Sequence, residues 1–74
     1  MNFVTCDQML KLAEGLAKAL YCELERFDYQ YNETDEKKTK AFVWLHEVGS
    51  EPFKTIYQYE IGANLEVRFI GVDC

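Results

Sequence analysis

The sequence has little of what catalysis and metal binding require. It contains one histidine, His46, and three cysteines, Cys6, Cys22 and Cys74, with no Cys-x-x-Cys pair. Scattered thiols and a lone imidazole give too few clustered ligands for a zinc site. The sequence also lacks the Gly-x-Ser-x-Gly, His-Glu-x-x-His and glycine-rich phosphate-binding motifs. We therefore expect a non-enzymatic protein without a metal ion or a cofactor.

An enzymatic alternative would depend on His46, because histidine is the side chain that changes charge near neutral pH. In that alternative, a carboxylate orients His46 as a general base. The interpretation that we favour is structural: a histidine on the surface of a sheet, close to the aromatic side chain of Trp44.

Long apolar runs are also missing. No stretch approaches the ~20 apolar residues of a membrane span. Residues 1–5 lack the basic region and the apolar run of a secretory signal peptide. An odd number of widely spaced cysteines does not indicate a disulfide framework. These features predict a protein of the cytoplasm that does not bind a membrane.

The chain has an excess of acidic over basic residues, and this excess is concentrated in one segment. Residues 23–36 contain six acidic residues and one basic residue, Arg26, so this segment carries the whole net charge of −5. Residues 37–74 carry five acidic and five basic residues, which cancel. Charge that is concentrated in this way can select a partner. The alternative is that it only keeps the protein soluble and prevents the edge strand from pairing with other chains. The candidate partner-binding residues are Glu23, Glu25, Asp28, Tyr29, Tyr31, Glu33, Asp35 and Glu36.

The apolar pattern predicts one helix followed by short strands. Thr5 and Gln8 have the spacing of a capping box, and apolar residues then recur at helical spacing until about residue 22. Alternating patterns predict strands at residues 27–31, 40–48, 53–61 and 65–72, with Ile70 and Val72 crossing to the other face from Phe69. Polar or glycine-containing turns separate these strands. If the helix instead continues to about residue 27, three strands remain.

Short connections favour antiparallel neighbours. We therefore expect a single α+β domain over residues 1–74. In this domain, one N-terminal helix packs on a three- to four-stranded antiparallel meander sheet, as a two-layer sandwich. Eleven large aromatic residues exceed what one small core can hide, so some should face a partner or a second copy.

Direct binding of nucleic acid is disfavoured by charge. Aromatic residues on the sheet face away from the helix could stack on bases, with Phe42, Trp44, Tyr29 or Tyr31 as candidates. Phosphate contacts need lysine and arginine, however, and a domain of net charge −5 repels phosphate. The only basic cluster, Lys37, Lys38 and Lys40, follows acidic residues directly.

The leading hypothesis is a small acidic protein-binding module that docks on a basic protein surface and occludes a nucleic-acid-handling protein, such as a nuclease. Its size, acidity and lack of catalytic motifs are similar to those of immunity proteins, antitoxins and phage-encoded anti-CRISPR or anti-restriction proteins. The alternative is a structural module that forms a homodimer through the open sheet face or through a strip of small residues, Gly15, Ala19 and Cys22. A small enzyme or an RNA-binding sheet is the third alternative.

Overall fold

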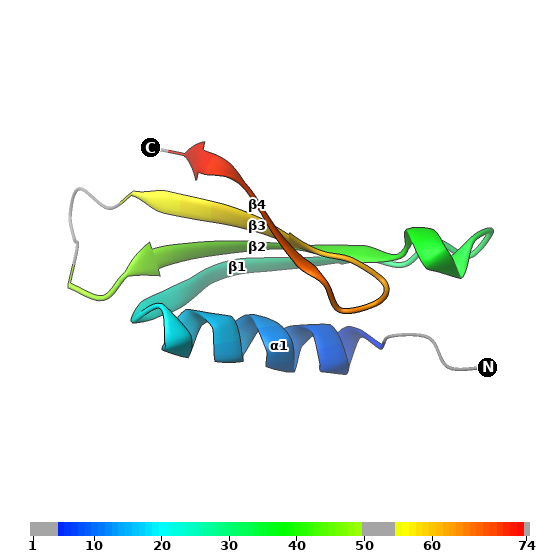
Figure 1. Ribbon diagram of the computed structural model, residues 1–74, viewed down its shortest axis with the longest axis horizontal. Coiled ribbons are helices and arrows are strands. Elements are labelled where there is room, and N and C mark those ends of the chain that lie inside the picture. Colours follow the sequence, from blue (N-terminus) through cyan, green and yellow to red (C-terminus); the bar gives the residue numbers. More distant parts are fainter. Residues whose placement is uncertain (1–4, 50–54, 74) are drawn as a thin grey trace.

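The computed structural model describes residues 5–49 and 55–73, which form one helix and one sheet (Figure 1). The elements are α1 (Cys6–Ala19), β1 (Cys22–Gln30), the short 3-10 helix η1 (Glu36–Lys38), β2 (Lys40–Glu47), β3 (Ile56–Ile61) and β4 (Val67–Asp73). Within the described residues, the four strands pair antiparallel in the order β1-β2-β3-β4. The predicted α+β meander with an N-terminal helix is thus confirmed, in its four-stranded form.

Helix α1 begins where the capping box predicts. The backbone N–H of Gln8 donates to the hydroxyl of Thr5 (3.2 Å), and the backbone N–H of Thr5 donates to the side-chain oxygen of Gln8 (2.9 Å). These two bonds satisfy two of the donors that a helix start leaves unpaired. The helix ends at Ala19, three residues before the predicted end. In the described part of the chain, no helix is long and apolar enough to cross a membrane.

Strand β1 begins at Cys22, five residues earlier than predicted. Tyr21, with a φ of 56°, turns the chain from the helix directly into the strand. A β-bulge between Leu24 and Arg26 then shifts the register by one residue. Because of this bulge, Leu24 and Phe27 lie on the same face of the sheet although they are three residues apart. The alternation of the sequence is broken there, which explains why the first half of the strand was missed.

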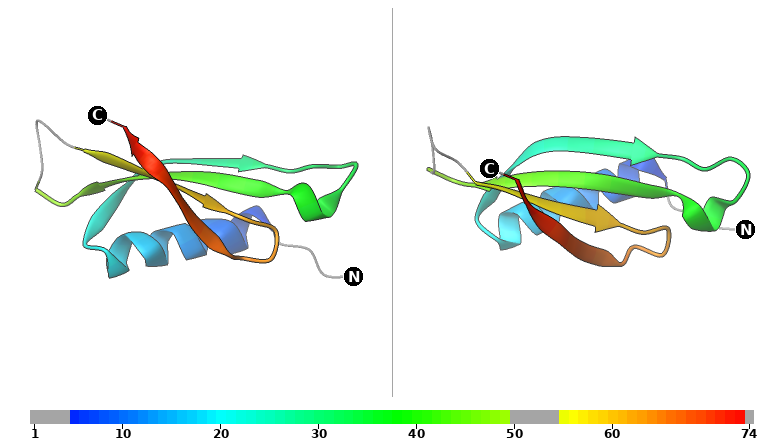
Figure 2. Two further views of the ribbon diagram at one scale, coloured as in Figure 1. Left: turned by 45° about the horizontal axis from the view of Figure 1, so that its top comes forward. Right: turned by 90° about the horizontal axis from the view of Figure 1, so that it is seen from above.

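Helix α1 lies against one face of the sheet (Figure 2), and the core between them includes Ile61 of β3 as well as residues of β2. Met9, Ala13 and Ala17 of the helix are buried against the strand β2 face formed by Ala41, Val43 and Leu45. The alternation predicted for residues 40–48 is confirmed, since Phe42 and Trp44 lie on the other face and are only partly buried. The turn predicted at residues 49–52 and the start of the strand predicted at 53–61 lie largely outside the described residues.

A single helix is too narrow to cover this sheet. An α-helix with its side chains is about 10 Å wide, whereas strands lie about 4.8 Å apart, so one helix covers about two strands. Helix α1 accordingly makes its main contacts with β1 and, to a lesser extent, with β2. Side-chain exposure then rises across the sheet: β2 residues on the helix side are buried, most β3 residues are partly buried, and Val67 to Ile70 of β4 are exposed.

A β-bulge in the pairing of β3 with β4 places Val72 on another face of the sheet than the sequence predicts. The pairing register shifts between Gln58 and Tyr59, so that Phe69 pairs with Tyr59 while Val72 pairs with Tyr57. Residues directly opposite each other share a face, which places Val72 on the same side as Phe69. The prediction that Val72 crosses to the other face from Phe69 was therefore wrong.

Leu45 is the residue whose truncation we expect to test this core best. Leu45 is fully buried between helix and sheet, so Leu45→Ala should lower the free energy of unfolding by about 2–5 kcal/mol. Urea denaturation followed by circular dichroism measures this change. Leu65→Ala, at a leucine that is 42% exposed, is the matched control and should cost much less. Equal losses in the two variants would contradict the assignment of the core.

Candidate functional site

The acidic segment of residues 23–36 does not form one patch. Glu23 and Glu25 lie at the start of β1, whereas Glu33, Asp35 and Glu36 follow the end of the same strand. At about 3.3 Å per residue, a strand of this length separates the two groups by roughly 30 Å. The molecule is elongated, with principal extents of 43 × 20 × 15 Å, and the two groups occupy opposite ends of the sheet.

At the first end, Glu23 and Glu25 surround His46. Glu23 Oε2 lies 3.1 Å from His46 Nε2, and Glu25 Oε2 lies 2.6 Å from Nδ1. The first approach has hydrogen-bond geometry, whereas the second is a close contact without the alignment of a hydrogen bond. The His46 side chain is only 6% exposed. Both carboxylates thus contact the imidazole, although the Glu23 side chain is 61% exposed, and neither imidazole nitrogen faces open solvent.

Glu47, on the helix side of the same end, is also engaged. The hydroxyl of Tyr57 donates a hydrogen bond to Glu47 Oε1 (3.1 Å). This hydrogen bond and the negative charge of Glu47 raise the pKa of Tyr57. Partial burial, together with the same charge, raises the pKa of the Cys22 thiol. The carboxylates of this end thus contact groups of their own sheet.

The aromatic rings on the sheet face away from α1 are covered by cations. The guanidinium of Arg26 lies 4.9 Å from the centre of the Trp44 ring, and the ammonium of Lys40 lies 5.5 Å from that of Phe42. Tyr29 pairs with Ala41 on the helix side and packs against the core, and burial raises the pKa of its hydroxyl. The four candidate stacking residues therefore do not share one open face.

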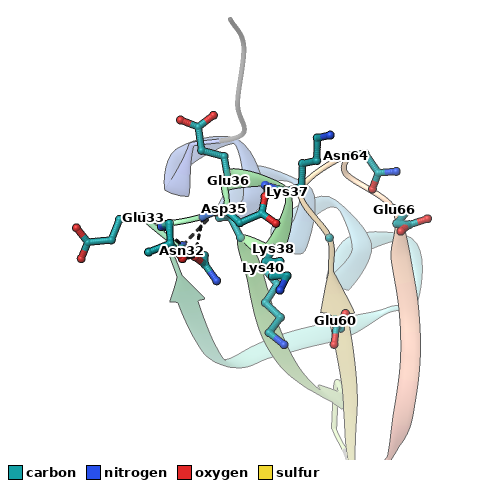
Figure 3. Close-up of a pocket in the computed structure, with 14 residues that line it drawn as sticks. Asn32, Glu33, Asp35, Glu36, Lys37, Lys38, Lys40, Glu60, Asn64 and Glu66 are labelled. Carbon is teal, nitrogen blue, oxygen red and sulfur yellow. Dashed lines mark hydrogen bonds between the residues drawn. The ribbon is translucent and has the colours of Figure 1, made fainter.

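At the second end, two turns enclose an acidic cleft (Figure 3). The β1–β2 connection and the β3–β4 turn line a space of about 1020 Å³. Alternate turns of an antiparallel meander lie at the same end of the sheet, which brings residues 32–40 beside residues 60–66. The charged residues that line this acidic cleft are Glu33, Asp35, Glu36, Glu60 and Glu66 together with Lys37, Lys38 and Lys40.

The loop that carries the predicted acidic residues is held by side-chain hydrogen bonds. Asn32 Oδ1 accepts from the backbone N–H groups of Thr34 (3.1 Å) and Asp35 (2.9 Å) and from the Thr34 hydroxyl (2.8 Å). The hydroxyl of Thr39, a buried residue, accepts from the N–H of Asn32 (3.1 Å). Asp35 Oδ1 accepts from the N–H of Lys37 at the start of η1 (3.1 Å). The loop thus presents its carboxylates from a fixed backbone.

The lysines of the acidic cleft do not neutralise it by direct contact. Within residues 5–49 and 55–73, no ion pair joins Lys37, Lys38 or Lys40 to a carboxylate, whereas Glu60 pairs with Arg68 at 3.2 Å. Glu33 and Glu36 point outward from the loop, as Figure 3 shows. Lys54, which could also fold over the acidic segment, lies outside the described residues.

The predicted site residues are thus distributed over the His46 end of the sheet, the middle of β1 and the end with the acidic cleft. Glu33, Asp35 and Glu36 line the acidic cleft, Tyr31 is 47% exposed at the entrance to this loop, and Asp28 lies mid-strand, where it accepts a hydrogen bond from Gln30. Sequence reasoning missed Glu60 and Glu66. The signal that finds them is topological, since the turn after β3 must lie at the same end as the loop after β1.

Comparisons with known proteins add no further assignment. No protein-family model matches the chain, and neither a curated protein nor a solved structure is significantly similar to it. The geometry and charge of the residues themselves therefore carry the functional argument.

Asn32 is the residue on which the shape of the acidic loop depends. Asn32→Ala removes an acceptor for three donors, so we expect the free energy of unfolding to fall by about 1–2 kcal/mol. We also expect faster amide hydrogen exchange at residues 34 and 35. Asn64→Ala, in the exposed turn on the other side of the cleft, is the control and should change neither quantity appreciably. Unchanged exchange in Asn32→Ala would contradict the role of its side chain.

The Tyr57–Glu47 hydrogen bond makes a pH-dependent contribution to stability. Because the pKa of Tyr57 is raised in the folded state, its contribution is complete below the ordinary tyrosine value of about 10 and is lost as pH rises through the folded value. Tyr57→Phe should therefore be destabilising at neutral pH, and the difference from wild type should shrink above about pH 10. Urea unfolding at both pH values measures this.

The control for this experiment is Tyr21→Phe, at a tyrosine that is 83% exposed. Glu47→Gln should also shift the alkaline absorbance titration of the tyrosines to lower pH, because it removes the charge that opposes the phenolate. A stability difference for Tyr57→Phe that grows with pH would contradict the assignment.

Proposed function

We propose that the protein is a non-enzymatic protein-binding module that docks its acidic cleft on a basic protein surface. The observation that carries this proposal is that five carboxylates line the cleft or its rim against three lysines, with one of the five, Glu60, paired to Arg68. These carboxylates come from the β1–β2 loop, from β3 and from the β3–β4 turn, so the fold adds Glu60 and Glu66 to a segment that was already acidic. The opposite end supports the same choice, because its glutamates face His46 and Tyr57.

Preorganisation strengthens this proposal. Binding costs less when the contacting groups are already fixed, and the hydrogen bonds of Asn32 and Asp35 fix the loop backbone. Glu33 and Glu66 are exposed on the two sides of the cleft. Negative potential at this end increases the association rate with a cationic surface and makes that rate depend on salt.

The partner class that suits this cleft is a protein that handles nucleic acid. Such proteins present arrays of lysine and arginine spaced for phosphates, and a rigid set of carboxylates can occupy them. We propose on this basis that the protein acts as an inhibitor that occludes such a surface. Cys6 and Cys22 are free thiols, which supports a reducing compartment such as the cytoplasm as the place of action.

Charge reversal on the two sides of the cleft tests this function. Glu33→Lys with Glu66→Lys raises the net charge by four and leaves Asp35, which caps η1, in place. The partner is first captured from the source cell at low salt and identified. Its association rate with the purified protein is then measured by stopped flow, where we expect the double variant to bind about tenfold more slowly, with a flatter salt dependence.

The matched control places the same charge on the solvent face of α1. Glu14→Lys, Gly15→Lys and Ala19→Lys together also raise the net charge by four, at three exposed positions. A Cβ at Gly15 would meet no atom within 4 Å, so the change is sterically tolerated. If this control slows association as much as the cleft variant does, the effect is one of net charge and the proposed cleft is wrong.

A further inference from the structure

The helix side of β3 and β4 carries an apolar surface that the rest of the described chain leaves open. Its members are register partners of one another and of the buried residues Val43, Leu45 and Ile61, which assigns them to the helix side. We call this surface the β3–β4 patch; it consists of Tyr57, Tyr59, Val67, Phe69 and Val72. Val67, Phe69 and Val72 are 40%, 52% and 53% exposed.

The β3–β4 patch is a continuation of the core. Tyr59 packs against the core cluster and also contacts Phe69, with ring centres 5.3 Å apart in an edge-to-face arrangement. The apolar layer that α1 covers over β1 and β2 thus runs on, without a helix, over β3 and β4. Taking 150–250 Å² as the area of a large aromatic side chain, the open part of this layer is on the order of 400 Å².

We propose that a second copy of this chain covers the β3–β4 patch, so that the protein forms a dimer with twofold symmetry. In a twofold interface the same surface meets itself. A typical stable interface buries about 800 Å² per partner, somewhat more than half of it apolar. The patch supplies close to that apolar share, and the exposed Leu65 beside it adds to the total.

Charge favours a second copy over a basic partner at this surface. The five side chains of the patch carry no charge, whereas the chain as a whole carries −5. Two copies that meet here bring uncharged side chains together, with the one neighbouring carboxylate, Glu47, held by Tyr57 at the margin, so a cationic partner gains little from this surface. The patch and the acidic cleft therefore suit different occupants, and this inference does not rest on the proposed function.

The two edge strands of the sheet also differ in charge, and this difference favours association through β4. Strand β1 is protected as an edge by Glu23, Glu25, Asp28 and a bulge, which are features that prevent association. Strand β4, the other edge, exposes Val67, Phe69, Ile70 and Val72. The asymmetry places the interface on the β3–β4 half, and not on the open outer face or on the small-residue strip of α1.

Sedimentation velocity over a range of concentrations tests this proposal. We expect the wild-type chain to pass from monomer to dimer between about 1 and about 200 µM. Val72→Lys places a charge on each side of the interface, so its dissociation constant should rise at least about 30-fold. Phe69→Lys should act in the same direction. Because it also removes the Tyr59 contact, circular dichroism must show that both variants remain folded.

Val48→Lys is the matched control, since Val48 is 62% exposed but lies outside the patch, and it should dimerise like wild type. Amide chemical shifts on dilution locate the interface independently and should change along β3 and β4. A wild-type chain that stays monomeric at about 200 µM overturns the proposal. It is equally overturned by a dimer that survives Val72→Lys, or by shift changes confined to the solvent face of α1 or to the outer sheet face.

Discussion

The packing of one amphipathic helix on a sheet twice its width is the constraint from which the rest of this structure follows. Met9, Ala13 and Ala17 bring α1 close to the strands because two of these three contacts are alanine. Close approach gives a fully buried core over β1 and β2 that reaches Ile61 of β3, but one helix is too narrow to cover β4 as well. Within residues 5–49 and 55–73, α1 is the one α-helix that packs on the sheet, and the helix side of β4 stays exposed.

The distribution of charge follows from the same sheet. A strand of nine residues carries the acidic segment from one end of the molecule to the other, so a cluster in the sequence becomes two clusters in space. The carboxylates of the first cluster contact His46, because the bulge in β1 brings Glu25 as well as Glu23 to it. The other gains carboxylates from a neighbouring turn. The two ends of the molecule therefore differ in what they can offer a partner.

Local signals in the sequence were sufficient for most of the fold. The capping box at Thr5 and Gln8 identified the start of the helix, and the two-faced pattern of residues 40–48 identified the central strand, because each depends on near neighbours along the chain. The failures at Leu24 and Val72 both come from β-bulges, which shift the alternation by one residue through pairing with another strand. Glu60 and Glu66 were missed for a related reason: their place at the same end of the sheet as Glu33 depends on strand order, which no single segment encodes.

The meander also has a consequence for how the chain folds. Strands β1 to β4 each pair with the next strand along the chain, and α1 packs mainly on the strand that follows it directly. Only two residues, Leu20 and Tyr21, separate α1 from β1. Contacts between elements close in sequence need little loop closure, and such topologies reach their transition state quickly. The helix and the first hairpin can therefore form their shared apolar layer before β4 joins the sheet, which makes the last strand an addition to an existing core and not a condition for it.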